Sequence, residues 1–178
     1  MPPFGATPGT LHSVLTCVRT APSAVTTELL SLLLPRGDAF ASATLLVQEE
    51  VAQRLFVDGP GGRDAREMSV RLRFHADPHY VARVPRSCFA PPPGVDSALV
   101  RMELMRPEEW PVPRARAAAF FSFVRTAFGA RRKMLRNTLP SVAGVLADAG
   151  CAVDCRPQEL SLAQFVRLFE LVGAHLDE

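Results

Sequence analysis

The pattern of apolar and polar residues changes near residue 110 of this 178-residue chain. Before that point, short apolar runs alternate with helix-like patterns, which is typical of an α/β fold. Beyond it, apolar residues recur at helical spacing only. The sequence therefore predicts an irregular N-terminus over residues 1–12, an α/β part over 13–106 and an all-helical part over 114–178. Prolines at 107, 111 and 113 mark the linker between the two parts.

Four segments of the α/β part have the composition or alternation of β-strands. Ser97–Leu104 alternates most clearly, because every second residue from Ala98 onward is apolar and faces one side. Arg66–Phe74 stays ambiguous, since it alternates like a strand while its length also fits a short helix. The other predicted strands are Ser13–Val18, Ala43–Val47 and Tyr80–Val84.

Helical patterns separate the first strands and fill the second part. Thr26–Leu34 is predicted to be a helix with Thr26 or Thr27 as N-cap and Glu28 in the first turn, where the helix dipole favours an anion. Ser161 is the predicted N-cap of the last helix. The remaining predicted helices are Glu49–Phe56, Ala117–Ala127, Arg131–Leu139, Val142–Ala149 and Leu162–Val172.

Charge is distributed unevenly along the chain. The hydrophobic content of 48% is enough for a core, and the net charge of +2 predicts no partner by itself. No acidic residue occurs between Trp110 and Ala147, and a basic segment within a near-neutral chain indicates an anionic partner at that place. The basic residues of this window are Arg114, Arg116, Arg125, Arg131, Arg132, Lys133 and Arg136.

The cysteines and the apolar runs argue against two classes of function. Cys17, Cys88, Cys151 and Cys155 form no Cys-x-x-Cys pair and complete no zinc spacing with the histidines, so we expect reduced, mostly buried thiols and no metal. No apolar run reaches the length of about 18 residues that a membrane span needs, so no membrane partner is expected.

The stretch FGARRKMLRNTL, from Phe128 to Leu139, contains the only lysine of the chain, Lys133. On a helix that starts at Arg131, Arg132 and Arg136 share a face at a spacing of four, with Lys133 beside them. Charge alone leaves two interpretations open: a solvated basic face, or a surface that binds phosphates through arginine side chains.

Four motifs, in order, resemble those of the rRNA adenine dimethyltransferases. Phe128–Leu139 is similar to the signature FxxRRKxLRNxL, and Phe89–Ala98 resembles FxPxPxVDSA. Leu46–Leu55 is similar to a strand-to-helix segment of the family, and Arg156–Ser161 resembles its R-P-x-E-L-S element. Each motif alone is weak, but together they cover residues 46 to 161 in the expected order.

The resemblance implies a fold, an activity and partners. These enzymes join a Rossmann-like domain that binds S-adenosylmethionine to a small helical domain, and they dimethylate two adjacent adenosines of small-subunit rRNA. Relatives include mitochondrial transcription factors of the B type and checkpoints of ribosome assembly. Residues 13–106 would then form the back half of the Rossmann-like domain. Arg131, Arg132, Lys133 and Arg136 would contact rRNA from the helical domain.

The sequence departs from the family at its cofactor and catalytic motifs. It has no glycine-rich loop after a strand, since Gly59, Gly61 and Gly62 follow a predicted helix, so we expect no S-adenosylmethionine site in this chain alone. The catalytic motif N-L-P-Y is replaced at its aligned positions, where only the proline is kept and the base-stacking tyrosine is a serine. These degenerate positions are Thr20, Ala21, Pro22 and Ser23.

Two residues of the FxPxPxVDSA segment have alternative interpretations. Phe89 matches the family aromatic that stacks on the target base, and the other interpretation is a core phenylalanine beside a proline turn. Asp96 is interpreted as a structural cap at the start of a strand rather than a catalytic carboxylate, because no second titratable group lies near it in sequence.

Two functions therefore compete at this stage. The first is a truncated or degenerate family member that binds small-subunit rRNA or acts in ribosome assembly without catalysis. The second is a fragment of an active dimethyltransferase whose cofactor-binding half is missing. Either way, the missing first strands should leave an open sheet edge at Ser13–Val18, which invites a protein partner or self-association. The compartment stays open among cytoplasm, mitochondrion and plastid.

Overall fold

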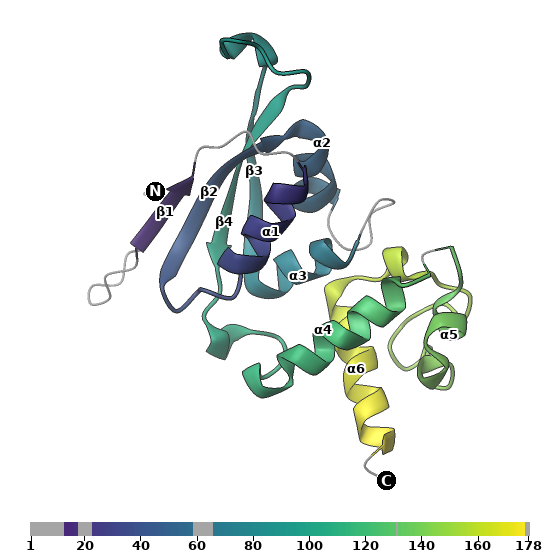
Figure 1. Cartoon of the computed structure of the whole chain (residues 1–178). Helices are drawn as coiled ribbons and strands as arrows, with labels where there is room; N and C mark the ends of the chain where they lie inside the picture. The colour runs from purple at the N-terminus through teal and green to yellow at the C-terminus, as the bar shows by residue number, and fades with distance from the viewer. Residues whose placement is uncertain (1–12, 18–22, 59–65, 131, 177–178) are drawn as a thin grey trace, which may run out of the picture.

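The computed structural model describes residues 13–17, 23–58, 66–130 and 132–176 and contains a four-stranded sheet and a group of helices (Figure 1). The strands are β1 (Ser13–Cys17), β2 (Phe40–Gln48), β3 (Ala76–Val84) and β4 (Ser97–Leu104). The α-helices are α1 (Ser23–Leu33), α2 (Glu49–Ala52), α3 (Glu67–His75), α4 (Arg114–Phe128), α5 (Leu135–Thr138) and α6 (Leu162–Leu176). A π-helical segment, η1 (Gln53–Asp58), continues α2. The short 3-10 helices are η2 (Arg86–Cys88), η3 (Pro107–Glu109), η4 (Pro140–Val142) and η5 (Pro157–Glu159).

The sheet has the order β1-β2-β4-β3. β1 and β2 are parallel and are joined through α1, as a parallel pair requires a crossover connection. β4 runs antiparallel to both β2 and β3, and β3 and β4 form a hairpin. β1 therefore lies at an edge of the described sheet, as the sequence predicted, and the strands β1, β2 and β3 end at the same side of it.

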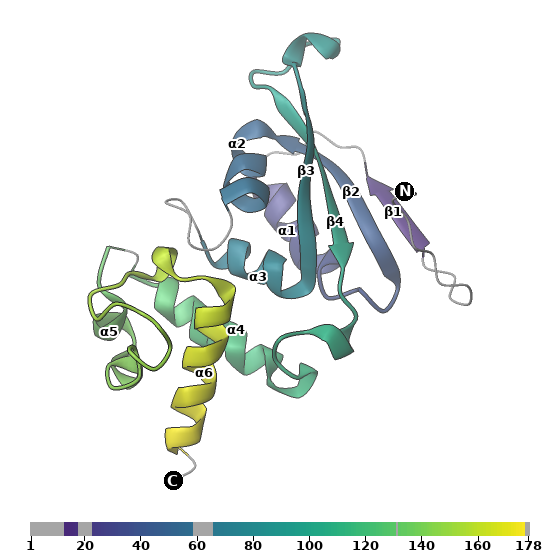
Figure 2. The same cartoon turned by 180° about the vertical axis from the view of Figure 1, so that it is seen from behind.

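Helices α1, α2 and α3 cover one face of the sheet, which Figures 1 and 2 show from opposite sides. The residues of β4 that face these helices are those that the alternation predicted: Ala98, Val100, Met102 and Leu104 are all buried. The opposite face carries ion pairs, with 3.6 Å between Arg101 and Glu103 and 3.3 Å between His79 and Asp77. A polar second face is typical of an antiparallel sheet with water on one side.

Helix α3 connects the sheet to the helical part because it is buried on two sides. Leu72 belongs to the core beneath the sheet, whereas Val70 and Phe74 belong to the core of the helical part. The Phe74 ring lies 5.2 Å from that of Phe120 and 4.8 Å from that of Phe121, both on α4. Such pairs add about 0.5–1.5 kcal/mol each beyond the burial of their area. This aromatic cluster fixes α4 against α3.

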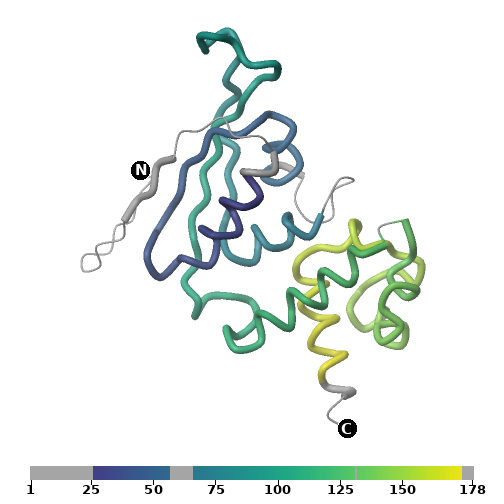
Figure 3. Tube along the Cα trace, viewed as in Figure 1, coloured from purple at the N-terminus to yellow at the C-terminus, as the bar shows by residue number. Residues whose placement is uncertain are grey.

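The helical part packs α4 and α6 against each other and against the turns around α5, as the trace in Figure 3 shows. Phe165 of α6 is fully buried and its ring lies 5.8 Å from that of Phe128. Ser161 caps α6 as predicted: the Gln164 N–H donates to Ser161 Oγ at 3.3 Å, and the Ser161 N–H donates to Gln164 Oε1 at 3.0 Å.

The predicted helix Arg131–Leu139 is wrong. α4 ends at Phe128, and α5 begins only at Leu135, so Arg132 and Arg136 do not share one helical face. The physical reason is a tertiary contact: the Leu135 N–H donates to the carbonyl of Cys155 at 2.8 Å instead of to the preceding turn. The Leu135 side chain is fully buried, and its burial outweighs local helix propensity.

The predicted helix Val142–Ala149 is also wrong, although its burial pattern is right. Val142, Val145, Leu146 and Ala149 are buried at helical spacing. Their backbone forms η4 and a chain of turns, with bonds such as Val145 N–H to Val142 O at 3.0 Å. A series of consecutive turns thus buries residues at the same spacing as a helix would. Gly150, with a φ of 67°, ends the segment in the left-handed region that favours glycine.

The start of α1 lies earlier than the sequence predicted. The helix begins at Ser23, so Thr26 and Thr27 lie inside it and Glu28 is not in its first turn. Thr26 is only 2% exposed, which explains why a threonine that resembles a cap lies in the helix: it packs against the core. The ambiguous segment 66–74 is helical, as α3. The other predicted strands and helices are confirmed within a few residues at their ends.

Gly37, in the turn between α1 and β2, lies against the backbone that follows β4. A Cβ added there would approach the carbonyl carbon of Met105 to 2.7 Å and the Arg106 nitrogen to 3.3 Å. We expect Gly37→Ala to lower the free energy of unfolding by about 1–3 kcal/mol, because backbone on both sides must shift. Gly144→Ala is the matched control, since an added Cβ there meets nothing within 4 Å. Urea denaturation of both variants measures the difference, and equal midpoints would contradict the close approach.

His75 makes the stability depend on pH. Its ring stacks on Trp110 at 4.6 Å, and burial, followed by the charge of Arg71, lowers its pKa from 6.5 to about 4. Between these values the unfolded chain binds a proton that the folded chain excludes. The contribution of the buried, neutral His75 to the free energy of unfolding is therefore fully present above pH 6.5 and is lost as the pH falls toward 4.

We expect this loss to reach about 3 kcal/mol, at about 1.4 kcal/mol per pKa unit. Unfolding followed by the fluorescence of Trp110 from pH 7 to pH 4 measures it. His75→Gln should flatten the dependence. An equal slope in the wild type and His75→Gln would exclude His75 as the source.

Candidate nucleic-acid interface

The loop between β3 and β4 carries Phe89 to the edge of the sheet where β1 and β2 end. The hairpin projects beyond that edge in Figure 1. η2 begins the loop, and the Phe89 N–H donates to the Arg86 carbonyl at 3.2 Å. Phe89 is half-buried in the described structure, so its ring is neither in a core nor fully in water. Ligands of α/β sheets bind outside the carboxyl ends of the strands, and the loop lies at that place.

Asp96 closes the base of this loop. Its Oδ1 accepts the Arg86 N–H at 2.9 Å, and its Oδ2 accepts Nε of Arg83 at 3.1 Å and also Nη2 of the same guanidinium. The Arg86 backbone bond, followed by the Arg83 side chain, holds the pKa of Asp96 below its usual value. These contacts support a structural role for Asp96, because its carboxylate is occupied by the loop itself.

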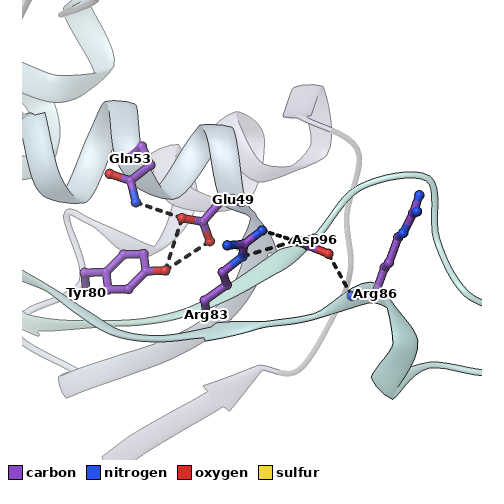
Figure 4. Close-up of polar contacts among 6 residues, drawn as sticks. All are labelled: Glu49, Gln53, Tyr80, Arg83, Arg86 and Asp96. Carbon is purple, nitrogen blue, oxygen red and sulfur yellow. Dashed lines mark hydrogen bonds and ion pairs between the residues drawn. The ribbon is translucent and has the colours of Figure 1, made fainter.

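Glu49, the first residue of α2, makes hydrogen bonds to β3 close to this loop (Figure 4). The Tyr80 hydroxyl donates to Oε1 at 3.1 Å and to Oε2 at 3.0 Å, and Gln53 Nε2 donates to Oε1 at 2.7 Å. The Glu49 N–H donates to the Asp96 carbonyl at 3.0 Å. One chain of contacts therefore joins α2, β3 and β4 at the base of the loop.

Sequence reasoning missed Glu49, Tyr80 and Arg83 as parts of this site. Tyr80 and Glu49 are separated by 31 positions, so no local pattern connects them. Glu49 was predicted only as the first residue of the helix Glu49–Phe56. One signal was available: Tyr80 is the only tyrosine, and the acidic residue Glu49 directly follows the buried strand β2.

The basic segment after α4 surrounds a shallow cavity of about 420 Å³. Both Arg132 and Lys133 line it and are exposed, and the aromatic ring of Phe128 forms part of its wall. Arg136 is exposed beside Met134, with 3.5 Å between its Nη2 and the methionine sulfur. Arg131 lies outside the described residues. The cavity thus combines an apolar wall with two cationic side chains.

The two candidate regions are separate. In both Figure 1 and Figure 2 the hairpin that carries Phe89 projects from one end of the sheet, whereas α5 and its flanking residues lie toward the other end. The structure therefore brings Arg132 and Lys133 to one cavity, with Arg136 exposed nearby in the chain, and does not bring Phe89 to them. A ligand that contacts both regions must be extended.

The degenerate catalytic positions lie mostly outside the described residues. Thr20, Ala21 and Pro22 are outside them, and Ser23 is the first residue of α1. The glycines at 59, 61 and 62 are outside them too. Among the described residues, the Glu49 carboxylate after β2 accepts the Tyr80 hydroxyl, and the Asp96 carboxylate before β4 accepts the Arg83 side chain.

The described part of the chain contains neither a metal-binding cluster nor a membrane span. No group of three or more His, Cys, Asp or Glu side chains there is placed to hold a metal ion. No described helix is both long enough and apolar enough to span a bilayer. Cys151 and Cys155 are buried free thiols, and burial raises the pKa of Cys155 to about 11, whereas Cys88 is exposed.

The Tyr80 hydroxyl offers a direct test of the contact with Glu49. Burial, followed by the hydrogen bond to Glu49, raises the pKa of Tyr80 above 10.0. Because the chain has one tyrosine, absorbance near 295 nm during an alkaline titration reports this group alone. Glu49→Gln should bring the midpoint down toward 10, and Glu50→Gln, on the exposed neighbour, should not. Identical midpoints in the wild type and Glu49→Gln would show that this hydrogen bond does not form in solution.

Known proteins similar to this chain fall into one group. The family model described as ribosomal RNA adenine dimethylase matches residues 8–172. The chain is 37% identical over 162 residues to a chloroplastic ribosomal RNA small subunit methyltransferase of Arabidopsis thaliana, covering 88% of this chain and 47% of that protein. It is 40% identical over 154 residues to ribosomal RNA small subunit methyltransferase A of Protochlamydia amoebophila, covering 83% and 52%. The chain thus spans about half the length of these relatives.

Solved structures show the same fold. The chain resembles the 23S rRNA methyltransferase ErmE with a TM-score of 0.70 at 22% identity, covering 93% of this chain and 67% of that one. A dimethyladenosine transferase from Plasmodium falciparum gives a TM-score of 0.69 at 18% identity, covering 93% and 70%. The α/β class predicted from the sequence, a partial Rossmann-like sheet followed by helices, is confirmed. The extent of the family match shows that this chain belongs to the ribosomal RNA adenine dimethylase family.

Proposed function

We propose that this chain is a degenerate member of its family that binds small-subunit rRNA, in ribosome assembly, without catalysing methyl transfer by itself. The observation that carries the proposal is a cavity lined by Phe128 and by the exposed Arg132 and Lys133, followed in the chain by the exposed Arg136. Arginine forks match phosphate oxygens, and the absence of acidic residues from 110 to 147 removes local competition for these cations. Arg131 is the fourth residue proposed for this contact.

Phe89 provides the second contact in this proposal. A half-buried aromatic ring at the carboxyl ends of the strands is placed to stack on an unpaired base, and such stacking contributes about 1–3 kcal/mol per base. The distance between the hairpin and the basic segment favours a folded or extended RNA over a free nucleotide. The replacement of N-L-P-Y by the residues at 20–23 favours binding without chemistry.

A second function is favoured by one specific observation. β1 is paired on one side only within the described sheet, and the chain spans about half of its relatives. Both facts fit a chain that works with further strands, from the same polypeptide or from a partner, which would supply the S-adenosylmethionine site of an active rRNA adenine dimethyltransferase. A protein partner or a second copy of this chain at the β1 edge belongs to the same proposal.

The compartment follows from the relatives only as a proposal. One relative is described as chloroplastic, and others are bacterial proteins. We place this chain inside the cell, in the cytoplasm or in an organelle such as a plastid or mitochondrion, where small-subunit rRNA is found.

The double variant Arg132→Ala/Arg136→Ala tests the RNA contact. It should weaken binding to a small-subunit rRNA fragment regardless of sequence and flatten the dependence of log K on log salt by up to about two units, at roughly one per lost phosphate contact. Filter binding at several salt concentrations measures both. Arg36→Ala is a control, because Arg36 is an exposed arginine paired with Asp38 in the turn between α1 and β2.

An unchanged slope in the double variant would show that this segment is an ordinary solvated surface and does not bind phosphates. Methyl transfer to rRNA by the purified 178-residue chain alone would contradict both functions, because neither gives this chain an S-adenosylmethionine site of its own. Incorporation of labelled methyl groups from S-adenosylmethionine after addition of the N-terminal half of a relative would support the second function, and RNA binding without incorporation under the same conditions supports the first.

A further inference from the structure

Cys151 and Cys155 flank a short turn in the helical part of the chain. Their side chains are only 8% and 6% exposed and belong to the same buried cluster. The Cys155 N–H donates to the Ala152 carbonyl at 3.1 Å, which closes the turn between them. The two cysteines therefore lie at the ends of one closed turn, with both thiols in the same core.

The two thiols contact each other. The Cys151 Sγ donates to the Ala149 carbonyl at 3.6 Å, and the Cys155 side chain hydrogen-bonds to the Cys151 thiol. Burial raises the pKa of both thiols, that of Cys155 to about 11, whereas the bond from Cys155 lowers the pKa of Cys151. Because the thiolate is the reactive form of cysteine, Cys151 is the better nucleophile of the two.

The backbone between the two cysteines belongs to no helix or strand. Ala152, Val153 and Asp154 are exposed, and Val153 is 57% exposed. Segments with exposed residues and few ordered hydrogen bonds open locally more readily than packed helices. Opening of this turn would give a small molecule access to both thiols while α4 and α6 stay packed.

We propose that Cys151 and Cys155 form a reversible disulfide with each other on reaction with an oxidised small-molecule disulfide, such as glutathione disulfide. The Cys151 thiolate attacks one sulfur of the reagent, and a mixed disulfide forms as the first small thiolate leaves. The Cys155 thiolate then attacks the Cys151 sulfur, which forms the internal S–S bond and releases the second small thiolate. The leaving thiolates take up the protons that the cysteines release, so the pair is oxidised and the reagent is reduced to its two thiols.

The disulfide would constrain the start of α5. The Cys155 carbonyl accepts the Leu135 N–H at 2.8 Å, and the Gly150 carbonyl accepts Nε2 of Gln164 at 2.8 Å. The turn therefore joins α5 to the start of α6, and α5 carries the exposed Arg136. A covalent bond across the turn limits its opening, so the order of this segment depends on the balance of thiols and disulfides around the protein. The inference does not rest on the proposed RNA binding.

The experiment uses the 178-residue chain with Cys17→Ser and Cys88→Ser, in which the pair holds the only thiols. Incubation of the folded chain with glutathione disulfide should lower its intact mass by two hydrogen atoms, and dithiothreitol should restore it. With Cys155→Ala added, the chain should instead gain one glutathione, because nothing displaces the mixed disulfide at Cys151. With Cys151→Ala added, the gain should be slower, because the Cys155 thiol has the higher pKa.

Amide hydrogen exchange tests the constraint on α5. The Leu135 N–H should exchange about 30-fold more slowly in the oxidised chain than in the reduced one, the factor that loop-closure entropy gives for so short a ring. The Met105 N–H, which donates to the His75 carbonyl at 2.7 Å just after β4, is the control and should exchange equally in both.

A chain that keeps its mass, that forms only intermolecular disulfides, or that retains glutathione without closing the ring would overturn the disulfide. Equal exchange of the Leu135 N–H in the oxidised and reduced chains would overturn the constraint on α5. Neither result concerns RNA binding, which the salt slope of Arg132→Ala/Arg136→Ala decides, so failure of this inference and failure of the proposed function are separate results.

Discussion

The burial of α3 on two sides is the constraint on which the arrangement of the molecule depends. Leu72 packs beneath the sheet, and Phe74 packs among the rings of α4 and the linker. Because one rigid helix contributes to both cores, the helical part cannot rotate freely against the sheet. The cationic segment beyond α4 and the hairpin beyond β3 are thereby held at a fixed separation, so an RNA that contacts both must match it.

The same constraint explains what the sequence revealed about the fold. β4 was predicted with its ends correct, because one face is buried beneath helices and the other is mostly polar, with Leu99 as the apolar exception. Segment 66–74 was ambiguous because a helix buried on two sides loses the one-sided apolar stripe that identifies it. The predicted helix at 131–139 was wrong because the Leu135 N–H bonds to Cys155, a partner distant in sequence. Local patterns recorded which residues are buried, whereas long-range contacts decided the backbone conformation.

For the candidate site, too, the sequence indicated which residues are involved but not which contacts they make. Phe89, Arg132, Lys133 and Arg136 were identified from motifs, and a structural role for Asp96 was inferred from its position before a strand. The partners that give Asp96 this role, Arg83 and the Arg86 N–H, follow from hairpin pairing that only the register of β3 and β4 reveals. Likewise, Glu49 and Tyr80 meet because η1, which continues α2, packs against β3. Residue types were readable from the sequence, but their contacts were not.

The loop between β3 and β4 has no part in either core, and this makes its construction informative. Most of its residues are exposed, and Val95 is 52% exposed. Its order comes instead from polar contacts at its base, where two acidic residues bind a tyrosine, an arginine and backbone N–H groups. Net contributions of such hydrogen bonds are modest, about 0.5–1.5 kcal/mol each, so they are a weak way to stabilise a domain. They are an effective way to fix the direction of a loop. A loop whose direction is fixed without any packing benefit is best explained by what it presents, the ring of Phe89.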